Sequence, residues 1–364
     1  IYVYPLQKDW QSRLCRETRP GLGELPRPDA PQDWAEEEFG SVGLYDERLK
    51  ERLLMLARDF FTQPGELVPQ ACHGSKARVK AAYRFFDNRN IDMQVLLQPH
   101  VEATIERIQA HKVVLAVQDT TTLSYTAHAA KDMGPINAKW NSAVGLIVHD
   151  TVAFTEDGTP LGLLDVQCWA RKPEEAGKRA LRHSLPIEQK ESMKWLNSYR
   201  AVGKAQRLCS ETMLVSVGDR EADIYELFEE ASKDSSGPEL LVRAMRGRGR
   251  KVEQVELWEK LAQQPAAGIQ EVHVPRKGSR RARTAKLAVH FAKIRLDPPK
   301  TKNSRPATMW AVFAQEVEVS QEVKTPIEWM LLTTVKTETF RDACKRIAWY
   351  SKRWGIEVYH RTLK

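Results

Sequence analysis

The chain has 364 residues, of which 42% are hydrophobic, 29% charged and 8% aromatic, an ordinary composition for a globular protein. At about 150 residues per domain, this length predicts two or three compact units. The composition excludes wholesale disorder, and no apolar run approaches the roughly 20 residues that cross a bilayer. Five dispersed cysteines without a CxxC pair argue against a disulfide framework or a zinc module, and they favour a reducing cytosol.

The formal net charge of +8 comes from one segment of the chain. Between Arg246 and Arg305 there are 16 Lys or Arg residues and 5 Asp or Glu residues, which leaves 40 basic and 43 acidic residues elsewhere. The basic runs RGRGRK (246–251), RKGSRRAR (276–283) and KTKNSR (300–305) alternate there with strand-like runs. Basic loops at the ends of a small sheet are suited to binding phosphates, although solvated loops without a ligand explain the charge equally well.

The first part of the chain predicts a leader and a helical domain. Residues 1–32 contain five prolines and no helical or strand period, so we expect an irregular leader of unassigned function. Over residues 33–108 the pattern is helical, with LYDERLKERLLMLARDFF and SKARVKAAYRFFDN as two amphipathic helices. The second of these concentrates four cations that face either a DNA groove or solvent, namely Lys76, Arg78, Lys80 and Arg84.

From residue 109 to residue 364 the pattern predicts one α/β core. Three hairpin-like strands, KVVLAVQD, SAVGLIVHDTVAF and PLGLLDVQCWA, precede an alternation of helix and strand. That order predicts a ribonuclease H-like mixed sheet with flanking helices. The basic segment reads as an insertion of short strands at about 245–330, and residues 338–364 predict one long terminal helix.

Two aspartates stand where predicted strands end. Asp119 follows the apolar run KVVLAVQ, and Asp219 follows TMLVSVG. Ligands of open α/β sheets usually bind at this edge. Each aspartate also precedes residues that it could cap, so a purely structural capping role is the competing interpretation.

The terminal helix carries a stripe of polar side chains. Tyr350, Arg353, Glu357 and Lys364 lie at offsets 0, 3, 7 and 14, which places them within about 60° on one helical face. A carboxylate surrounded by a phenol, a guanidinium and an ammonium suits a site for a divalent metal and a phosphate. A solvated face with ordinary ion pairs is the alternative.

These motifs together resemble a known family. The pattern Tyr350-x2-Arg353-x3-Glu357-x6-Lys364, with QDTTTLSY around Asp119 and GDREADI around Asp219, is similar to the bacterial insertion-sequence DDE transposases that share a Tyr-Arg-Glu-Lys signature, the family of the cut-and-paste enzyme of a kanamycin-resistance transposon. The resemblance runs from about Trp34 to Lys364. It implies that Asp119, Asp219 and Glu357 are catalytic and hold two Mg²⁺ ions, with Mn²⁺ as a substitute. It also implies that Tyr350, Arg353 and Lys364 grip phosphate.

The resemblance assigns two further residues to DNA. Trp329 would form part of a pocket for a flipped base, whereas without the family a core tryptophan is the default interpretation. Arg243 would contact DNA, since an arginine buried at a strand end otherwise needs a carboxylate partner. The implied partner is double-stranded DNA, both transposon ends and target. The full-length protein is expected to be a homodimer in a synaptic complex, without a membrane, in the bacterial cytoplasm and associated with the nucleoid.

The implied reaction is nicking of the 3′ strand at a transposon end, hairpin formation and resolution, and transfer of the 3′-hydroxyl into target DNA. Residues 33–108 would bind the DNA end, and residues 109–364 would form the catalytic core. The sequence contains no HExxH, Walker or GxSxG motif, which disfavours zinc hydrolases, ATP-driven motors and serine hydrolases. Two alternatives stay open. One is a related metal-dependent nuclease without strand transfer, and the other is a truncated DNA-binding inhibitor, because family members continue beyond the position of Lys364.

Overall fold

The computed structural model of the chain describes residues 33–125, 132–137, 143–172, 185–274, 282–300, 302–321, 323 and 325–364. The chain divides into two compact units, one comprising the residues up to Glu106 together with Val358–Lys364, the other Arg107–Glu357. The expected leader at 1–32 and most of the basic run at 276–283 lie outside the described residues. None of the described helices is both long enough and apolar enough to cross a membrane.

The first unit is helical, as predicted. Its helices are α2 (Trp34–Phe39), α3 (Glu47–Thr62), α4 (Val68–Ala71), α5 (Lys76–Phe86) and α6 (Met93–Gln109), which ends in the second unit. Asp33, Asp46 and Ser75 cap α2, α3 and α5 through side-chain oxygens that accept backbone N–H bonds, so these helices begin where the sequence supplies an acceptor. The core of the unit packs aromatic and leucine side chains, among them Phe39, Leu53, Leu56 and Phe85.

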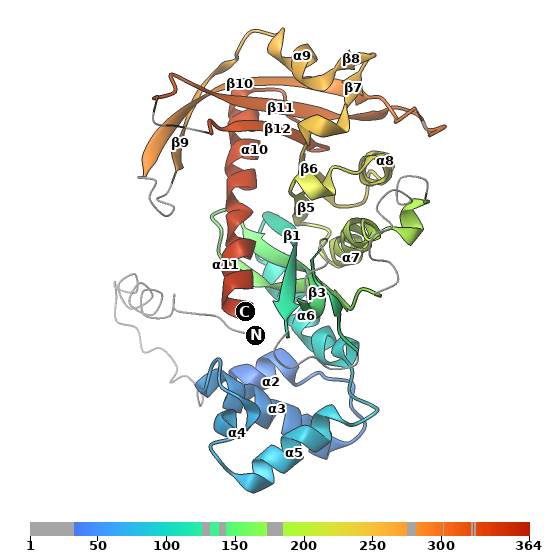
Figure 1. Cartoon of the computed structure of the whole chain (residues 1–364), viewed down its shortest axis with the longest axis vertical. Helices are drawn as coiled ribbons and strands as arrows, with labels where there is room; N and C mark the ends of the chain where they lie inside the picture. The colour runs from blue at the N-terminus through green and yellow to red at the C-terminus, as the bar shows by residue number, and fades with distance from the viewer. Residues whose placement is uncertain are drawn as a thin grey trace, which may run out of the picture. The chain divides into compact units, whose positions relative to one another are not determined.

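The second unit is built on one mixed sheet (Figure 1). Its first strands are β1 (Val113–Ser124), β2 (Gly134–Pro135), β3 (Val144–Thr155), β4 (Pro160–Trp169), β5 (Met213–Gly218) and β6 (Glu239–Arg243). Five of them lie in the order β4-β3-β1-β5-β6, with β3 antiparallel to both β4 and β1, and β5 parallel to both β1 and β6. This is the ribonuclease H order, and the predicted fold class is confirmed.

The insertion extends the same sheet. It contains β7 (Lys251–Val252), β8 (Val255–Glu256), β9 (Gly268–Val274), β10 (Arg283–Leu296) and β11 (Ala307–Val317), and β12 (Glu328–Thr333) returns from it. β12 pairs antiparallel with β6, and β11 and β10 follow outward. The prediction of short strands was wrong for β10 and β11, which have 14 and 11 residues, because their alternating buried side chains pack against helices.

Helices cover the sheet. They are α7 (Met193–Leu208), α8 (Tyr225–Lys233), α9 (Leu257–Ala262), α10 (Phe340–Lys352) and α11 (Trp354–Leu363), and short 3₁₀ helices lie at Ile187–Gln189, Arg220–Ala222 and Arg246–Arg248. α7 contacts the strands of the ribonuclease H core, whereas α9 and α10 contact β10 and β11. A continuous apolar cluster joins α7, α8 and α9 to the strands beneath them, with Trp195, Phe228 and Leu257 fully or almost fully buried. This core holds rigid the strand ends that carry the predicted site.

Candidate active site and nucleic-acid interface

Asp119 lies on β1 at the point where that strand leaves its parallel neighbour. The pairing of β1 with β5 ends at Val117, whereas β1 continues to Ser124 beside β3, so the prediction that the strand ends at Asp119 was wrong. The three threonines after Asp119 are β-branched and favour extended backbone, and their partners on β3 satisfy it. Asp119 Oδ1 accepts the N–H of Thr120 at 2.8 Å, and Oδ2 accepts a bond from Arg353.

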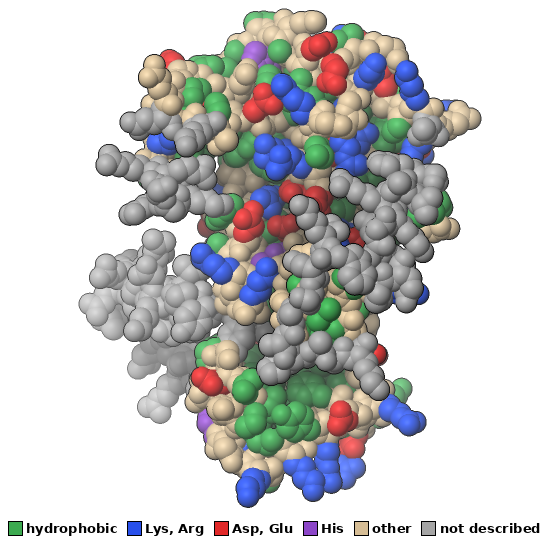
Figure 2. Space-filling model, viewed as in Figure 1, with side chains coloured by type: hydrophobic (Ala, Val, Ile, Leu, Met, Phe, Trp, Pro, Cys, Tyr) green, Lys and Arg blue, Asp and Glu red, His purple; other side chains and the backbone are tan. Residues whose placement is uncertain are grey.

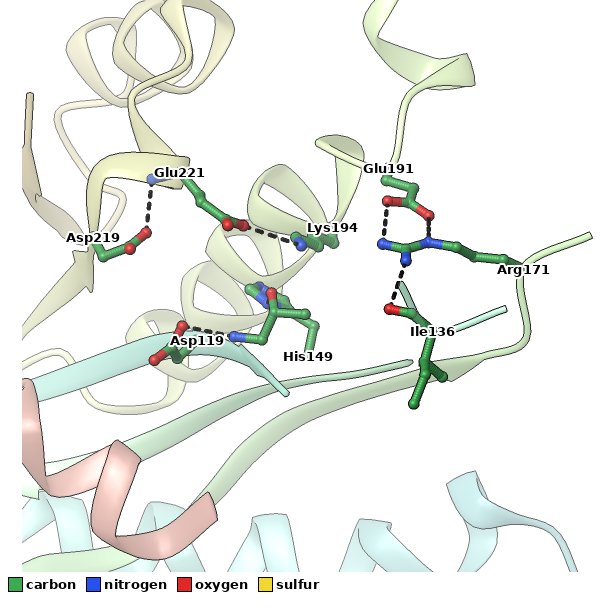
Figure 3. Close-up of polar contacts among 9 residues, drawn as sticks. Asp119, Ile136, His149, Arg171, Glu191, Lys194, Asp219 and Glu221 are labelled. Atoms are coloured by element: carbon green, nitrogen blue, oxygen red, sulfur yellow. Dashed lines mark hydrogen bonds and ion pairs between the residues drawn. The ribbon is translucent and has the colours of Figure 1, made fainter. Parts of the chain in front are cut away.

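Asp219 follows β5 directly and caps a short turn. Its Oδ1 accepts the N–H of Glu221 at 2.7 Å, which makes it the N-cap of the 3₁₀ helix Arg220–Ala222 (Figure 3). The glycine before it permits this turn, because a Cβ on Gly218 would collide with the methyl group of Ala222. The structure therefore shows the capping role that competed with the catalytic interpretation. The cap uses one oxygen of the Asp219 carboxylate, and this bond holds the carboxylate in one orientation.

Arg353 joins Asp119 to Glu357. The expected single terminal helix is interrupted at Arg353, where α10 ends and α11 begins. Nη1 of Arg353 donates to Asp119 Oδ2 at 3.1 Å, and Nη2 donates to Glu357 Oε1 at 2.5 Å. Burial lowers the pKa of the Arg353 guanidinium, but Tyr350, Asp119 and Glu357 outweigh it and the pKa is raised overall. The guanidinium is thus a permanent cation between two carboxylates.

Next to Arg353, the candidate site contains Tyr350, Trp329 and Arg243. The Trp329 and Tyr350 rings meet edge to face with centroids 5.2 Å apart. Burial raises the pKa of the Tyr350 phenol, against the opposing effect of Arg353 and Arg243, and the charge of Asp219 raises it further. Arg243 also donates to the carbonyl of Glu328 at 3.0 Å. Trp329 is half-buried rather than a core residue, so part of its surface is accessible.

Lys364 is the remaining residue of the predicted stripe. It is exposed, follows the end of α11, and belongs to the first unit. The other predicted members of the site, Asp119, Asp219, Glu357, Tyr350 and Arg353, belong to the second unit. The part of Lys364 in the site stays a prediction.

Sequence reasoning missed Lys194. This lysine lies in the first turn of α7, and its Nζ is 3.7 Å from Glu221 Oε2, beside the turn that carries Asp219 (Figure 3). Burial lowers the pKa of the Lys194 ammonium, although Glu221, Glu191 and Asp119 act in the opposite direction. No motif singles this lysine out, because its environment is created by chain segments far apart in sequence.

The donor chemistry of the site fits a hard divalent ion. Asp119, Asp219 and Glu357 offer only carboxylate oxygens, the ligands that Mg²⁺ prefers. Among the described residues no group of three or more Asp, Glu, His or Cys side chains is gathered closely enough to hold a metal ion, and the Arg353 guanidinium is bonded to two of the carboxylates instead. On the face drawn in Figure 2, acidic side chains of the second unit gather with basic side chains on either side of them.

The first unit presents a basic groove along α5. Lys76, Lys80, Tyr83 and Arg84 line this groove, and all four are exposed. Within the described residues the three cations make no ion pair, which leaves their charge available to a ligand. Arg78 differs, because it donates to the buried Asp59 at 2.9 Å. Three of the four predicted cations therefore face outward together with an aromatic ring, the composition expected of a nucleic-acid surface.

Two comparisons relate this chain to known proteins. The Transposase DNA-binding family model matches residues 31–91, a segment that contains α2 to α5. The structure is also similar to a piggyBac transposase determined by cryo-electron microscopy in a synaptic complex with hairpin DNA, with a TM-score of 0.37 at 8% identity. The similarity covers 96% of this chain, which spans 63% of the piggyBac chain. The family match supports the transposase part of the predicted resemblance.

Proposed function

We propose that this chain is a DNA transposase that cuts DNA at transposon ends and transfers the strands, as the resemblance to the insertion-sequence family implies. The observation that carries the proposal is the contact of Arg353 with Asp119 and Glu357, on a ribonuclease H sheet that shares its chain with a segment matching a transposase DNA-binding family. Two carboxylates brought from a strand and a helix to one guanidinium are costly to assemble unless the site has a use for them.

The residues of the candidate site have different roles in this proposal. Asp119, Asp219 and Glu357 are those that would hold Mg²⁺ or Mn²⁺, which supplies activation of the attacking oxygen and neutralisation of the leaving one. Arg353 and Tyr350 would bind the phosphate that is cut, as a charge-assisted and a neutral donor respectively. Arg243 would also contact the DNA, and Trp329 offers an aromatic face to an extruded base during hairpin formation.

The α5 groove would hold the transposon end. Lys80 and Arg84 neutralise phosphates, and Tyr83 supplies contact area between them. The bacterial origin, the hairpin intermediate, target DNA as a second substrate and the homodimeric synaptic complex belong to this proposal.

Cleavage and joining assays on the purified full chain separate the three functions. Duplexes are first selected from a random-sequence pool by the chain itself and then incubated with Mg²⁺. Cutting followed by joining to a second duplex supports a transposase, whereas cutting without joining indicates a nuclease. Binding without cutting indicates an inhibitor.

The same duplexes test the groove. Replacing Lys80 and Arg84 together with Gln should weaken binding by about tenfold or more, and it should reduce the slope of log affinity against log salt by about 2. Arg48→Gln is the matched control, since Arg48 is equally exposed in this unit but is paired with Asp46. An equal effect of both changes would remove the groove from the proposal.

A further inference from the structure

We propose that Lys194 binds a phosphate of the DNA at the cleavage site, near Asp119. The inference rests on the proposed function, and it adds a residue of α7 to those that bind the DNA. In Figure 3, Lys194 points from α7 toward Glu221, on the side of the site that carries Asp119 and Asp219.

Within the described residues Lys194 makes one ion pair, and the charges of Glu191 and Asp119 act on it without an ion pair. Its side chain is only 11% exposed, yet its one ion pair is long, at 3.7 Å, and leads to Glu221, whose side chain is 70% exposed. A solvated partner at that distance offsets little of the cost of burying an ammonium. The Trp195 ring, with its centroid 5.8 Å from Nζ, adds a weak contact at most.

The position on the helix adds to the cost. Lys194 is the second residue of α7, which has 16 residues, and the amino end of a helix carries positive partial charge. A cation there is repelled by the helix and would be favoured in the last turn instead. A lysine that is largely buried, weakly paired and placed at the wrong helix end is best explained by an anion that joins it.

The local backbone is held firmly enough to present the ammonium. Gln167 on β4 donates to the carbonyl of Lys194 and to the hydroxyl of Ser198, each at 2.9 Å, and Ser198 donates to Asp165 at 2.6 Å. These bonds fix the first turns of α7 to the sheet. The backbone from which the Lys194 side chain extends therefore has a set location before substrate arrives.

Phosphate is the anion that fits the position. The charges of Lys194 and Asp119 interact, and Arg353 donates to the same carboxylate. The site therefore offers two cations to phosphodiesters, the Arg353 guanidinium and the Lys194 ammonium. DNA brings such groups at every nucleotide, so one phosphate next to the cut reaches Lys194 while the cut phosphate faces Arg353.

The test compares Lys194→Met and Lys194→Arg with the wild-type chain on the selected duplexes. Lys345→Met is the matched control, because Lys345 also pairs with a glutamate, Glu156, and lies over a tryptophan, Trp349, but does not face the site carboxylates. The affinity is measured against salt and against duplexes that carry one neutral methylphosphonate at each position in turn. Melting temperatures of all four proteins are measured in parallel.

We expect Lys194→Met to melt no lower than the wild type, to bind about tenfold more weakly, and to lose about one counterion from the salt slope. One methylphosphonate should weaken the wild type equally and have no further effect on Lys194→Met, while Lys194→Arg restores most of the affinity. Unchanged binding, an unchanged methylphosphonate pattern, or a drop in melting temperature that accounts for the loss would each overturn the assignment. Because the readout is binding, it decides the question even if the wild type does not cut, which is the result that would refute the proposed function.

Discussion

Replacing Asp119 with Asn is the sharpest test of the site, because the change keeps the shape of the side chain and removes only its charge. The amide oxygen can still accept the Thr120 N–H. The amide nitrogen then takes the place of Oδ2, which is 3.1 Å from Nη1 of Arg353 in the wild type. Two hydrogen-bond donors would therefore face each other at that distance. If the amide turns over to satisfy Arg353, the Thr120 bond is lost instead.

The stability cost follows from these contacts. A hydrogen bond to a charged group contributes about 1.5 to 3 kcal/mol, and partial solvation reduces the figure, since the Asp119 and Arg353 side chains are 20% and 15% exposed. Arg353 also keeps its bond to Glu357. We therefore expect a loss of about 1 to 2 kcal/mol, which lowers the melting temperature by about 2 to 8 °C in a unit of this size.

Cleavage should fall far more than stability. Losing one ligand of the proposed metal site removes a contact to the transition state, and we expect a loss of at least about a hundredfold in the cutting rate at saturating DNA. Affinity for the selected duplex should change by less than about twofold, because the binding cations are untouched. The three quantities are measured on one preparation by single-turnover cleavage, fluorescence anisotropy and thermal unfolding.

Glu316→Gln supplies the control for this experiment. Glu316 is a largely buried carboxylate bonded to Arg283 on the insertion, so its amide variant loses a comparable ion pair elsewhere in the same unit. It should destabilise the chain similarly and leave the cutting rate at saturation within about twofold. If Asp119→Asn retained cleavage, or lost binding in parallel with cleavage, the reasoning that makes Asp119 catalytic would be refuted and only its structural bonds would remain.

Three further outcomes are expected. Trp329→Ala should slow hairpin formation by about tenfold while sparing the first nick, with a loss of about 1 to 3 kcal/mol in stability, and a gel that resolves the two steps would expose a uniform slowing as the contrary result. Gly355→Ala should lower the free energy of unfolding by about 1 to 3 kcal/mol and reduce cleavage, because the new Cβ would lie 2.8 Å from an aromatic ring on β3. Gly43→Ala is the control, since nothing lies near the new Cβ, and it should change neither quantity in the same unfolding and cleavage assays. Burial raises the pKa of Glu316, but Arg283 and a backbone N–H outweigh it and hold the pKa below the ordinary 4.5. The stabilisation from Glu316 is therefore present above pH 4.5 and is lost as the pH falls through the lowered pKa. The unfolding free energies of the wild type and Glu316→Gln should converge as the pH falls, and a difference that stays constant would contradict this.

The sequence predicted the sheet of the second unit well because its strands are local patterns. Apolar runs ended by turn residues gave the three hairpin strands and the later alternation with helices, and the strand order followed from these elements alone. The sequence could not predict where a strand ends, because a strand continues as far as a neighbouring strand pairs with it. Asp119 looked terminal because a polar run follows it, but β3 is long enough to pair with that run as far as Ser124.

The break at Arg353 was hidden for a related reason. The polar and apolar periodicity of the terminal segment runs on across it, while the close approach of Gly355 to β3, which accompanies the break, depends on a strand about 200 residues earlier in the chain. Lys194 was invisible because burial and partner distance are properties of the folded chain. Local pattern thus predicted the elements, and the fold alone determined which charges meet.

The charges that meet explain why an arginine precedes the helical carboxylate by four residues. Asp119 and Glu357 come from a strand and a helix, and their like charges would repel each other at one end of the sheet. An arginine one helical turn before Glu357 lies next to it on the same face, so one guanidinium can donate to an oxygen of Asp119 and to an oxygen of Glu357 at once. Its planar fork suits this double contact better than a lysine would. Since the pKa of Arg353 is raised, its guanidinium stays charged between the two carboxylates without substrate, and in the proposed function it would be the donor that binds the phosphate.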